Sequence, residues 1–382
     1  MIYDVLNFKK TNSKVSYKLF NKNDGAAEFH AIVELATDFA ELSATEQFDK
    51  VEQSIVQLFS QPFLKNISPV LQRWFVSDVV NQAQLIKQSG DVAVSVVQQP
   101  PLNGSKVALW IYGIEGIQSA QTSNNALTIK RPAYSHYYHT QLYSTAGNAF
   151  QQTTSIFDNY IISLSQFQCS LDANCIRTWL FVNNVDNGYV DIVRARNKVF
   201  ESENLIPRTH YIASTGIEGK YKYPQVITLM DAYAISGIRP EQVVYLKGLS
   251  HLNPTHEYGV AFERGTAVQF GDRRHVYISG TASINNKGEI LHPLDIRLQT
   301  IRVLENIHVL LTEANCNMED IAQLIIYIRD IADYTFVDKY MRNQYPYIPM
   351  VIVLAAVCRP GWLIEMECIA IKDIEDSRFE KY

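Results

Sequence analysis

Two glutamates lie near the end of the chain in an otherwise apolar run. Glu365 and Glu367 fall in Trp362-Leu-Ile-Glu-Met-Glu-Cys-Ile-Ala-Ile371, whose pattern predicts a β-strand with both side chains on one face. A carboxylate among apolar neighbours costs free energy unless it is paired or protonated. Burial raises its pKa, and a carboxyl that stays neutral near pH 7 suits general acid catalysis. Glu365 is therefore a candidate acid; the alternative is an edge-strand glutamate that faces water.

Cys358 and Arg359 come shortly before this strand. Cys358 follows the apolar run Val351-Ile-Val-Leu-Ala-Ala-Val357, a setting typical of a buried core thiol, with a nucleophile as the alternative. Arg359 is either a solvated turn residue or a clamp for an anion.

Two further segments, and one helix, offer groups that bind anions. Ala213-Ser-Thr-Gly-Ile-Glu-Gly219, which contains Thr215, is a tight turn that donates backbone N–H groups or a plain loop. Phe262-Glu-Arg-Gly265 places Arg264 and Gly265 just before a strand. Arg196 lies on a predicted helix, where an arginine is by default a surface residue. The segment 213–219 does not have the spacing of a phosphate-binding loop.

Metal chemistry finds little support in the sequence. His136 and His139 have a spacing that can bind a metal, but no third ligand is obvious. The five cysteines show no CxxC or Cys/His pattern, which indicates reduced thiols. We predict no metal site and no cofactor.

A pattern that occurs twice organises the rest of the chain. Gln152 precedes Asn159 by the same interval as Gln299 precedes Asn306, 147 residues further on. A strand follows each of these helical stretches, at 177–182 and at 323–328, then a second helix and a last strand. We infer an internal duplication. The expected domains are an N-terminal segment of unclear role (1–104), a first repeat (105–240) that begins with the strand 107–113, and a second repeat (241–382).

Alternation of strands and helices predicts an α/β (α+β) fold of two sheet-plus-helices repeats with an N-terminal extension. Two such repeats packed edge to edge create a cleft, the natural place for a site. The net charge of −5 argues against a nucleic-acid partner. No apolar run reaches the ~18 residues of a membrane-spanning helix, and no signal peptide is seen. We therefore expect a cytoplasmic protein that does not bind membranes.

The stretch from about 264 to 373 resembles the YjgF/Rid family. The matching pieces are Val276-Tyr-Ile-Ser-Gly280, Gln299 through Asn306, the strand 323–328 and Leu363-Ile-Glu-Met-Glu367. Members are typically small homotrimers with clefts between subunits, and many hydrolyse enamines and imines. They carry an arginine shortly after a proline ahead of the penultimate strand. Here Pro349 is followed by Met350, Val351 and Ile352, so that arginine is missing.

Over a longer span, about 105 to 373, the chain is similar to the chorismatases. The resemblance rests on an ordered set of motifs: Arg177-Thr-Trp179, Tyr189 through Arg196, Ala213-Ser-Thr-Gly-Ile217, Tyr258-Gly259, Phe262-Glu-Arg264, Ile278 through Ile284, His292-Pro293, Cys358-Arg359 and Leu363-Ile-Glu365. The family more often has Ser where Glu263 stands and usually Gly at Leu294. The first ~100 residues match weakly, which leaves room for a changed substrate.

This resemblance implies cleavage of chorismate to pyruvate and either a hydroxybenzoate or a dihydroxycyclohexadiene carboxylate. Chorismate is a dianion with an enolpyruvyl ether, so the reaction needs a neutral acid near the methylene carbon and arginines for two carboxylates. The resemblance assigns the acid to Glu365. It assigns substrate binding to Arg196, Arg264 and Arg359, with Thr215 and Gly265 beside them. Cys358 would line the ring pocket, which favours 3-hydroxybenzoate.

Two other functions stay open: a Rid-like enamine or imine hydrolase, and a non-catalytic protein of the same fold that binds a small molecule. The oligomeric state is open as well. Fused repeats either mimic part of a trimer within one chain, leaving a monomer, or assemble further, for example as a homotrimer.

Overall fold

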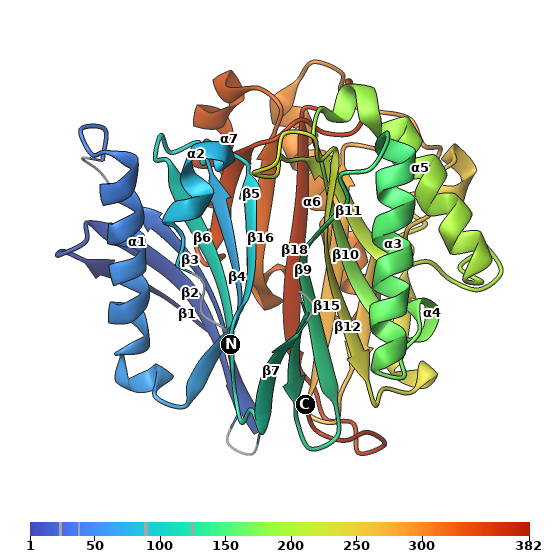
Figure 1. The fold of residues 1–382 in the computed structure, drawn as a ribbon, viewed down its shortest axis with the longest axis horizontal. Coiled ribbons are helices and arrows are strands. Elements are labelled where there is room, and N and C mark those ends of the chain that lie inside the picture. Colours follow the sequence, from blue (N-terminus) through green and yellow to red (C-terminus); the bar gives the residue numbers. More distant parts are fainter. Residues whose placement is uncertain (23–24, 37–38, 88–90, 124–125) are drawn as a thin grey trace.

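Three six-stranded sheets make up the computed structural model, which describes residues 1–22, 25–36, 39–87, 91–123 and 126–382 (Figure 1). We call the corresponding parts of the chain unit 1 (2–115), unit 2 (119–236) and unit 3 (243–373). In each unit the strands follow one order: three consecutive strands, then the last strand, then the remaining two. The fourth and fifth strands along the chain pair in parallel, and the other pairs are antiparallel.

The strands of the three units are bounded as follows. Unit 1 contains β1 (Ile2–Phe8), β2 (Ser13–Lys22), β3 (Gly25–Leu35), β4 (Ile67–Val76), β5 (Ala93–Gln98) and β6 (Val107–Glu115). Unit 2 contains β7 (Ser119–Ser123), β8 (Ala126–Lys130), β9 (Ser135–Tyr143), β10 (Cys175–Val182), β11 (Ala213–Glu218) and β12 (Thr228–Ser236). Unit 3 contains β13 (Val243–Leu246), β14 (Gly265–Gln269), β15 (Arg273–Ala282), β16 (Ile321–Ile328), β17 (Met350–Leu354) and β18 (Ile364–Asp373).

Helices occupy the same places in each unit. A long helix follows the third strand: α1 (Ala44–Phe59), α3 (Ala149–Gln166) or α6 (Ile296–Glu313). A second helix joins the two parallel strands: α2 (Val79–Gln82), α5 (Val185–Ser202) or α7 (Tyr334–Gln344), and the short α4 (Leu171–Asn174) precedes β10. Figure 1 shows α1 and α3 on the outside of their sheets, so each sheet has one face toward its helices and one toward the other sheets.

One buried glutamine in each long helix ties that helix to the start of the last strand. It is the fourth helical residue each time, and its side-chain oxygen accepts the backbone N–H of the residue just before the strand. The pairs are Gln47 with Lys106 at 2.8 Å, Gln152 with Ile227 at 2.8 Å, and Gln299 with Leu363 at 2.9 Å. The repeat predicted from Gln152 and Gln299 is therefore structural, and Gln47 extends it to unit 1.

The strand at 107–113 does not begin the first predicted repeat. This segment is β6, which pairs with β3 and β4 and closes the sheet of unit 1. In unit 2 its expected place is taken by β9, which pairs with β12. Its apolar sequence resembles that of any central strand, so the sequence could not show which sheet it joins. The N-terminal extension thus forms a third unit, and we propose unit boundaries near residues 116 and 240.

The largest hydrophobic cluster joins the inner faces of all three sheets, with members such as Trp110, Tyr233 and Ile278. Two smaller clusters lie between the sheets of units 1 and 2 and their helices. The units meet in cyclic order. Gln141 of unit 2 donates to the carbonyl of Val94 in unit 1, the amide of Ser214 in unit 2 donates to Ser279 in unit 3, and β16 returns to β2 and β3.

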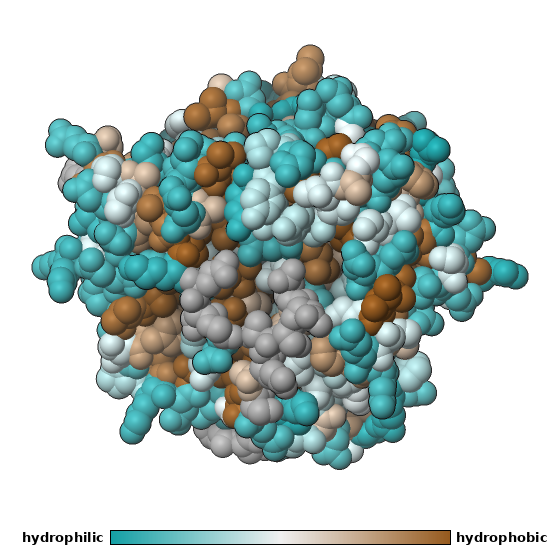
Figure 2. All heavy atoms as spheres, viewed as in Figure 1, coloured by the Kyte–Doolittle hydropathy of each residue, from teal (hydrophilic) through white to brown (hydrophobic). Residues whose placement is uncertain are grey.

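Hydrophilic side chains cover most of the face drawn in Figure 2, with hydrophobic residues in small separate groups. No helix in the described part of the chain is long and apolar enough to span a bilayer.

Candidate active site between units 2 and 3

A cavity with an empty volume of about 490 Å³ lies where unit 2 meets unit 3. Helix α5 and strand β11 of unit 2 supply one side. Strands β15 and β18, the segment before β14 and the loop before β18 supply the other. Five residues predicted from the sequence line it together: Arg196, Arg264, Cys358, Arg359 and Glu365. Residues far apart in the chain converge because β11 docks beside β15, held by the Ser214–Ser279 hydrogen bond at 2.9 Å.

Glu365 is the second residue of β18, and its side chain is 4% exposed. No hydrogen bond reaches its carboxyl from the described residues. A Cβ on Gly280 would clash with Glu365 Oε1, so glycine at this position leaves room for the carboxyl where it lies. Burial raises the pKa of Glu365 to about 8, and the nearby Glu367 carboxylate raises it further, while Arg177 and Arg264 oppose the shift. Glu365 therefore carries a proton at neutral pH.

Glu367 points to the same side of the strand but is fully bonded. Its carboxylate accepts from Arg177 Nη2 at 2.7 Å and from Trp179 Nε1 at 2.8 Å. The hydroxyl of Thr215 also donates to it. The two glutamates thus have different environments: Glu367 is bound by three hydrogen-bond donors, whereas Glu365 is protonated and accepts no hydrogen bond from the described residues.

Three arginines face the cavity, and none forms an ion pair with a carboxylate in the described part of the chain. Arg196 is 1% exposed, and its Nε and Nη2 have no hydrogen-bond partner. Arg264 donates to the carbonyl and Oδ1 of Asn253, at 3.0 and 3.2 Å from Nη2. The guanidinium of Arg359 lies over the ring of Tyr258 at 4.6 Å. Arg196 and Arg264 are buried cations without a carboxylate partner among the described residues, which costs several kcal/mol that a bound anion would offset.

Cys358 lines the cavity as a neutral thiol. Burial, followed by the charge of Glu365, raises the pKa of Cys358 to about 12. A thiolate nucleophile is therefore disfavoured at neutral pH, and Cys358 contributes a small apolar surface to the pocket.

Thr215 and Gly265 do not line the cavity. Thr215 turns toward Glu367 and accepts the backbone N–H of Gly280 at 2.8 Å. Gly265 lies in β14, where a Cβ would come within 3.1 Å of the side chains of Ile278 and Leu246. Both residues are next to the site rather than in it.

Other residues of the site were not singled out from the sequence. Tyr258, Phe262 and Trp362 supply the aromatic faces of the cavity, and Gly280 makes room for the acid. Arg177 and Trp179 do not line the cavity but donate hydrogen bonds to the carboxylate of Glu367. Their only signal in the sequence was membership of the ordered motif set, because an arginine inside a strand has no distinctive spacing.

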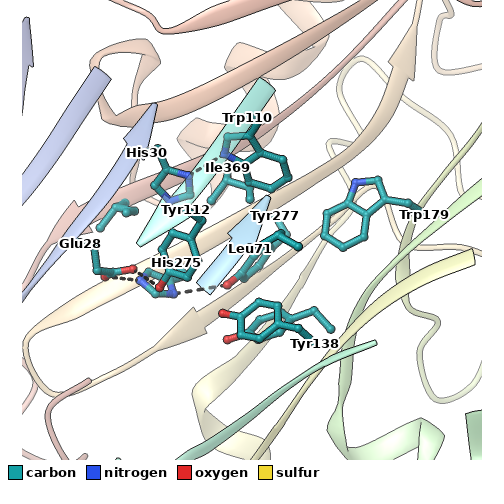
Figure 3. A pocket seen from close by; sticks show the side chains of 12 residues that line it. Glu28, His30, Leu71, Trp110, Tyr112, Tyr138, Trp179, His275, Tyr277 and Ile369 are labelled. Carbon is teal, nitrogen blue, oxygen red and sulfur yellow. Dashed lines mark hydrogen bonds and ion pairs between the residues drawn. The ribbon is translucent and has the colours of Figure 1, made fainter. Parts of the chain in front are cut away.

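A second cavity of about 350 Å³ lies where the three sheets meet (Figure 3). Aromatic side chains from all three units line it, among them Trp110, Tyr138 and Tyr277. Its charged group, Glu28, is bound by His275 Nε2 and by the hydroxyl of Tyr112, each at 2.8 Å. Because Glu28 is already paired, this cavity offers less for a charged substrate than the one between units 2 and 3.

Comparisons with known proteins agree with this architecture. The family model for Endoribonuclease L-PSP matches residues 261–372. A RutC family protein of Pyrococcus abyssi is 32% identical over 110 residues, which is 28% of this chain and 84% of that protein. The 3-aminoacrylate deaminase RutC of Acinetobacter baylyi is 29% identical over 97 residues, 25% of this chain and 77% of the relative.

One solved structure matches nearly the whole chain. A crystal structure of chorismatase superposes with a TM-score of 0.66 at 14% sequence identity, over 91% of this chain and 100% of the other. The similarity includes unit 1, for which the sequence had shown only a weak match. At this identity the comparison establishes a shared fold.

Proposed function

Since the chain belongs, through residues 261–372, to the RutC family of Endoribonuclease L-PSP-like proteins and has the chorismatase fold, we propose that it cleaves the enolpyruvyl ether of chorismate. The products would be pyruvate and a ring carboxylate. The observation that carries this proposal is the cavity between units 2 and 3, where a protonated Glu365 faces arginines that lack carboxylate partners.

The arginines select the substrate class. Two planar carboxylates on one ligand match guanidinium groups that come from different sides of a pocket. Arg196 on α5 and Arg264 before β14 are both nine-tenths buried or more, which strengthens their attraction to an anion. Tyr258 and Phe262 add flat apolar surface for a ring. A small dianion with an unsaturated ring fits these features.

Glu365 supplies the proton. Transfer of its proton to the terminal methylene carbon of the enol ether gives an oxocarbenium ion, and the ionised Glu365 stabilises that cation. Attack by water gives a hemiketal that breaks into pyruvate and the dihydroxycyclohexadiene carboxylate. Formation of a hydroxybenzoate consumes no net water, because loss of the ring hydroxyl and aromatisation accompany release of pyruvate. We favour 3-hydroxybenzoate, since Cys358 lines the cavity and the resemblance to chorismatases with a cysteine in the pocket implies that product.

The Rid-like alternative, hydrolysis of an enamine or imine, rests on the RutC relatives. The residues argue against it. Rid-family members carry an arginine near their penultimate strand. Of the penultimate strands of units 2 and 3, β11 borders this cavity and β17 does not. The sequence of β11, Ala213-Ser-Thr-Gly-Ile-Glu218, contains no arginine, as Met350 through Ile352 in β17 contain none. A non-catalytic binding protein is the third possibility, and it would keep the arginines while having no use for a protonated glutamate.

The test is incubation of the purified protein with chorismate, with pyruvate measured enzymatically and the ring product identified by mass. We expect pyruvate and 3-hydroxybenzoate; a dihydrodiol instead would indicate simple hydrolysis. Glu365→Gln should lower the rate by about 10²–10⁴-fold while it still binds chorismate in calorimetry. Absence of pyruvate from wild-type protein that binds chorismate would favour the binding role, and turnover of 2-aminoacrylate alone would favour the Rid-like one.

A further inference from the structure

Four buried charges meet at the junction of the three units. Arg73 comes from β4 of unit 1, Arg177 and Asp231 from unit 2, and Glu367 from unit 3, and each is at most 2% exposed. Arg73 Nη2 lies 3.0 Å from Asp231 Oδ2, and Arg73 Nη1 lies 3.6 Å from Glu367 Oε1. Arg177 Nη2 lies 2.7 Å from Glu367 Oε2. Two positive and two negative groups therefore cancel in a region without solvent.

This cluster is connected to the acid of the cavity. Glu367 lies two residues beyond Glu365, on the same side of β18. Thr215 donates to Glu367 and accepts the N–H of Gly280, the residue against which the Glu365 carboxyl packs. A change in charge at Glu367 therefore acts on Glu365 in two ways. It changes the electrostatic potential at the Glu365 carboxyl, and it alters the hydrogen bonds of Thr215 that position Gly280.

We propose that unit 1, which lines no part of the cavity, takes part in the reaction through Arg73: with Arg177 it holds Glu367 as a carboxylate, and this negative neighbour keeps Glu365 in its acid form. Arg73, Arg177 and Glu367 are positioning residues in this scheme. The inference rests on the proposed function only in that it takes Glu365 to be the acid.

Electrostatics decides which glutamate carries the charge. Negative charge on two neighbouring carboxyls is unfavourable, and donors stabilise it on the one that they surround. Glu367 has Arg177, Trp179 and Thr215 as donors, whereas Glu365 has none from the described residues. The other groups that face Glu365 are Arg264 before β14, Tyr327 on β16, and Tyr189 and Cys358 across the cavity. The tyrosines and the thiol are neutral, so Glu367 is the negative charge that offsets Arg177 and Arg264.

The scheme makes two variants shift the pH dependence in opposite directions. In Glu367→Gln the arginines act on Glu365 alone, so its pKa falls and the alkaline limb of the rate profile moves to lower pH by about one unit. In Arg73→Gln a positive charge is lost, so the upper pKa of the glutamate pair rises and the limb moves to higher pH. Arg73→Lys keeps the charge and should leave the limb near that of the wild type.

The experiment compares pH–rate profiles of the four proteins with chorismate, after circular dichroism has confirmed that each is folded. In parallel, infrared titration follows the C=O stretch of the protonated carboxyl that is absent in Glu365→Gln, a measurement that needs no substrate. Shifts of opposite sign in both measurements support the proposal. The proposal is wrong if the folded variants have lower rates but the alkaline limb of their pH–rate profiles stays at the wild-type pH. If the infrared titration shifts as expected but the protein does not cleave chorismate, the coupling of Arg73 to Glu365 through Glu367 is supported and the proposed function is rejected.

Discussion

The position of the Glu365 carboxyl depends on the absence of a side chain at Gly280. Gly280 on β15 has no side chain, and a Cβ at that position would fall 2.1 Å from Oε1 of Glu365 and 3.0 Å from Cγ2 of Thr215. Thr215 is held by its hydrogen bonds to Glu367 and Gly280, so the Glu365 carboxyl would have to move into the cavity. The acid is therefore placed by a glycine as much as by its own strand.

Gly280→Ala should consequently lower turnover of chorismate by at least tenfold, because displacement of an acid by about 1 Å impairs proton transfer severely. The matched control is Gly188→Ala on α5, where the nearest atom to the new Cβ lies 3.6 Å away. That variant should keep its activity and gain slightly in thermal stability, since alanine is the better helix former. Equal activity of both variants would contradict the role given to Gly280.

The protonation of Glu365 also has a consequence for folding. Its pKa in the folded protein is raised to about 8, above the value of 4.5 for an exposed glutamate. The folded state thus holds a proton that the unfolded state loses, so the stability that Glu365 contributes is present below about pH 4.5 and is lost as the pH rises toward 8.

Glu365→Gln removes this dependence, because glutamine does not titrate. We expect the melting temperature of the variant to equal that of the wild type near pH 5 and to exceed it increasingly up to pH 8. Thermal unfolding followed by circular dichroism across this range measures the difference. A constant difference at all pH values would show that Glu365 is not protonated in the folded protein.

At the scale of elements, the long helix of each unit is fastened to the last strand by one glutamine. Gln299 binds the amide of Leu363, two residues before Glu365, and also donates to the carbonyl of Gly361 at 2.9 Å. Gln47 makes the corresponding bond to Lys106 in unit 1, far from the cavity. The same interaction therefore supports the site in one unit and only the fold in another.

Substitution of either glutamine by alanine leaves a backbone N–H without its partner, so Gln299→Ala and Gln47→Ala should each lose about 1–3 kcal/mol of stability in denaturant unfolding. Only Gln299→Ala should also lower chorismate turnover, because it loosens the start of β18. If both variants lost activity alike below their melting temperatures, position within the repeat would not explain the effect.

At the scale of the whole molecule, the three units close a ring. Strands of each sheet contact the next unit of the same chain: β5 contacts β9, β11 contacts β15, and β16 contacts β2 and β3. The three interfaces are not equivalent. The positions that correspond to Glu365 by strand register are Leu229 in unit 2 and Ala108 in unit 1, so the acid occurs at one interface.

Of the two oligomeric states that the sequence left open, we therefore predict the monomer. Light scattering coupled to size-exclusion chromatography should give a mass near 43.5 kDa at micromolar concentration. A mass near three times this value would show that the ring of units leaves another surface for assembly.

The local patterns of the sequence determined much of this protein. Apolar runs predicted β10, β16 and β18, and the shared spacing from Gln152 and Gln299 predicted two related units. A glutamate in an apolar strand pointed to the acid, because burial of a charge is costly wherever the strand lies. The arginines came from the resemblance to the chorismatases, since an arginine in a helix or loop has no spacing that marks a site.

Only the tertiary structure decided how these parts are combined. Strand register and sheet membership depend on contacts between distant residues, so β6 could not be placed in unit 1 from its own sequence. For the same reason the sequence could not separate Arg196, which lines the cavity, from Thr215, which turns toward Glu367. Whether a buried charge is paired depends on which strands meet at a junction. Glu367 is bound because the three sheets converge beside it and bring arginines to its carboxylate. Glu365 lies at the cavity, where the described residues offer it no such partner.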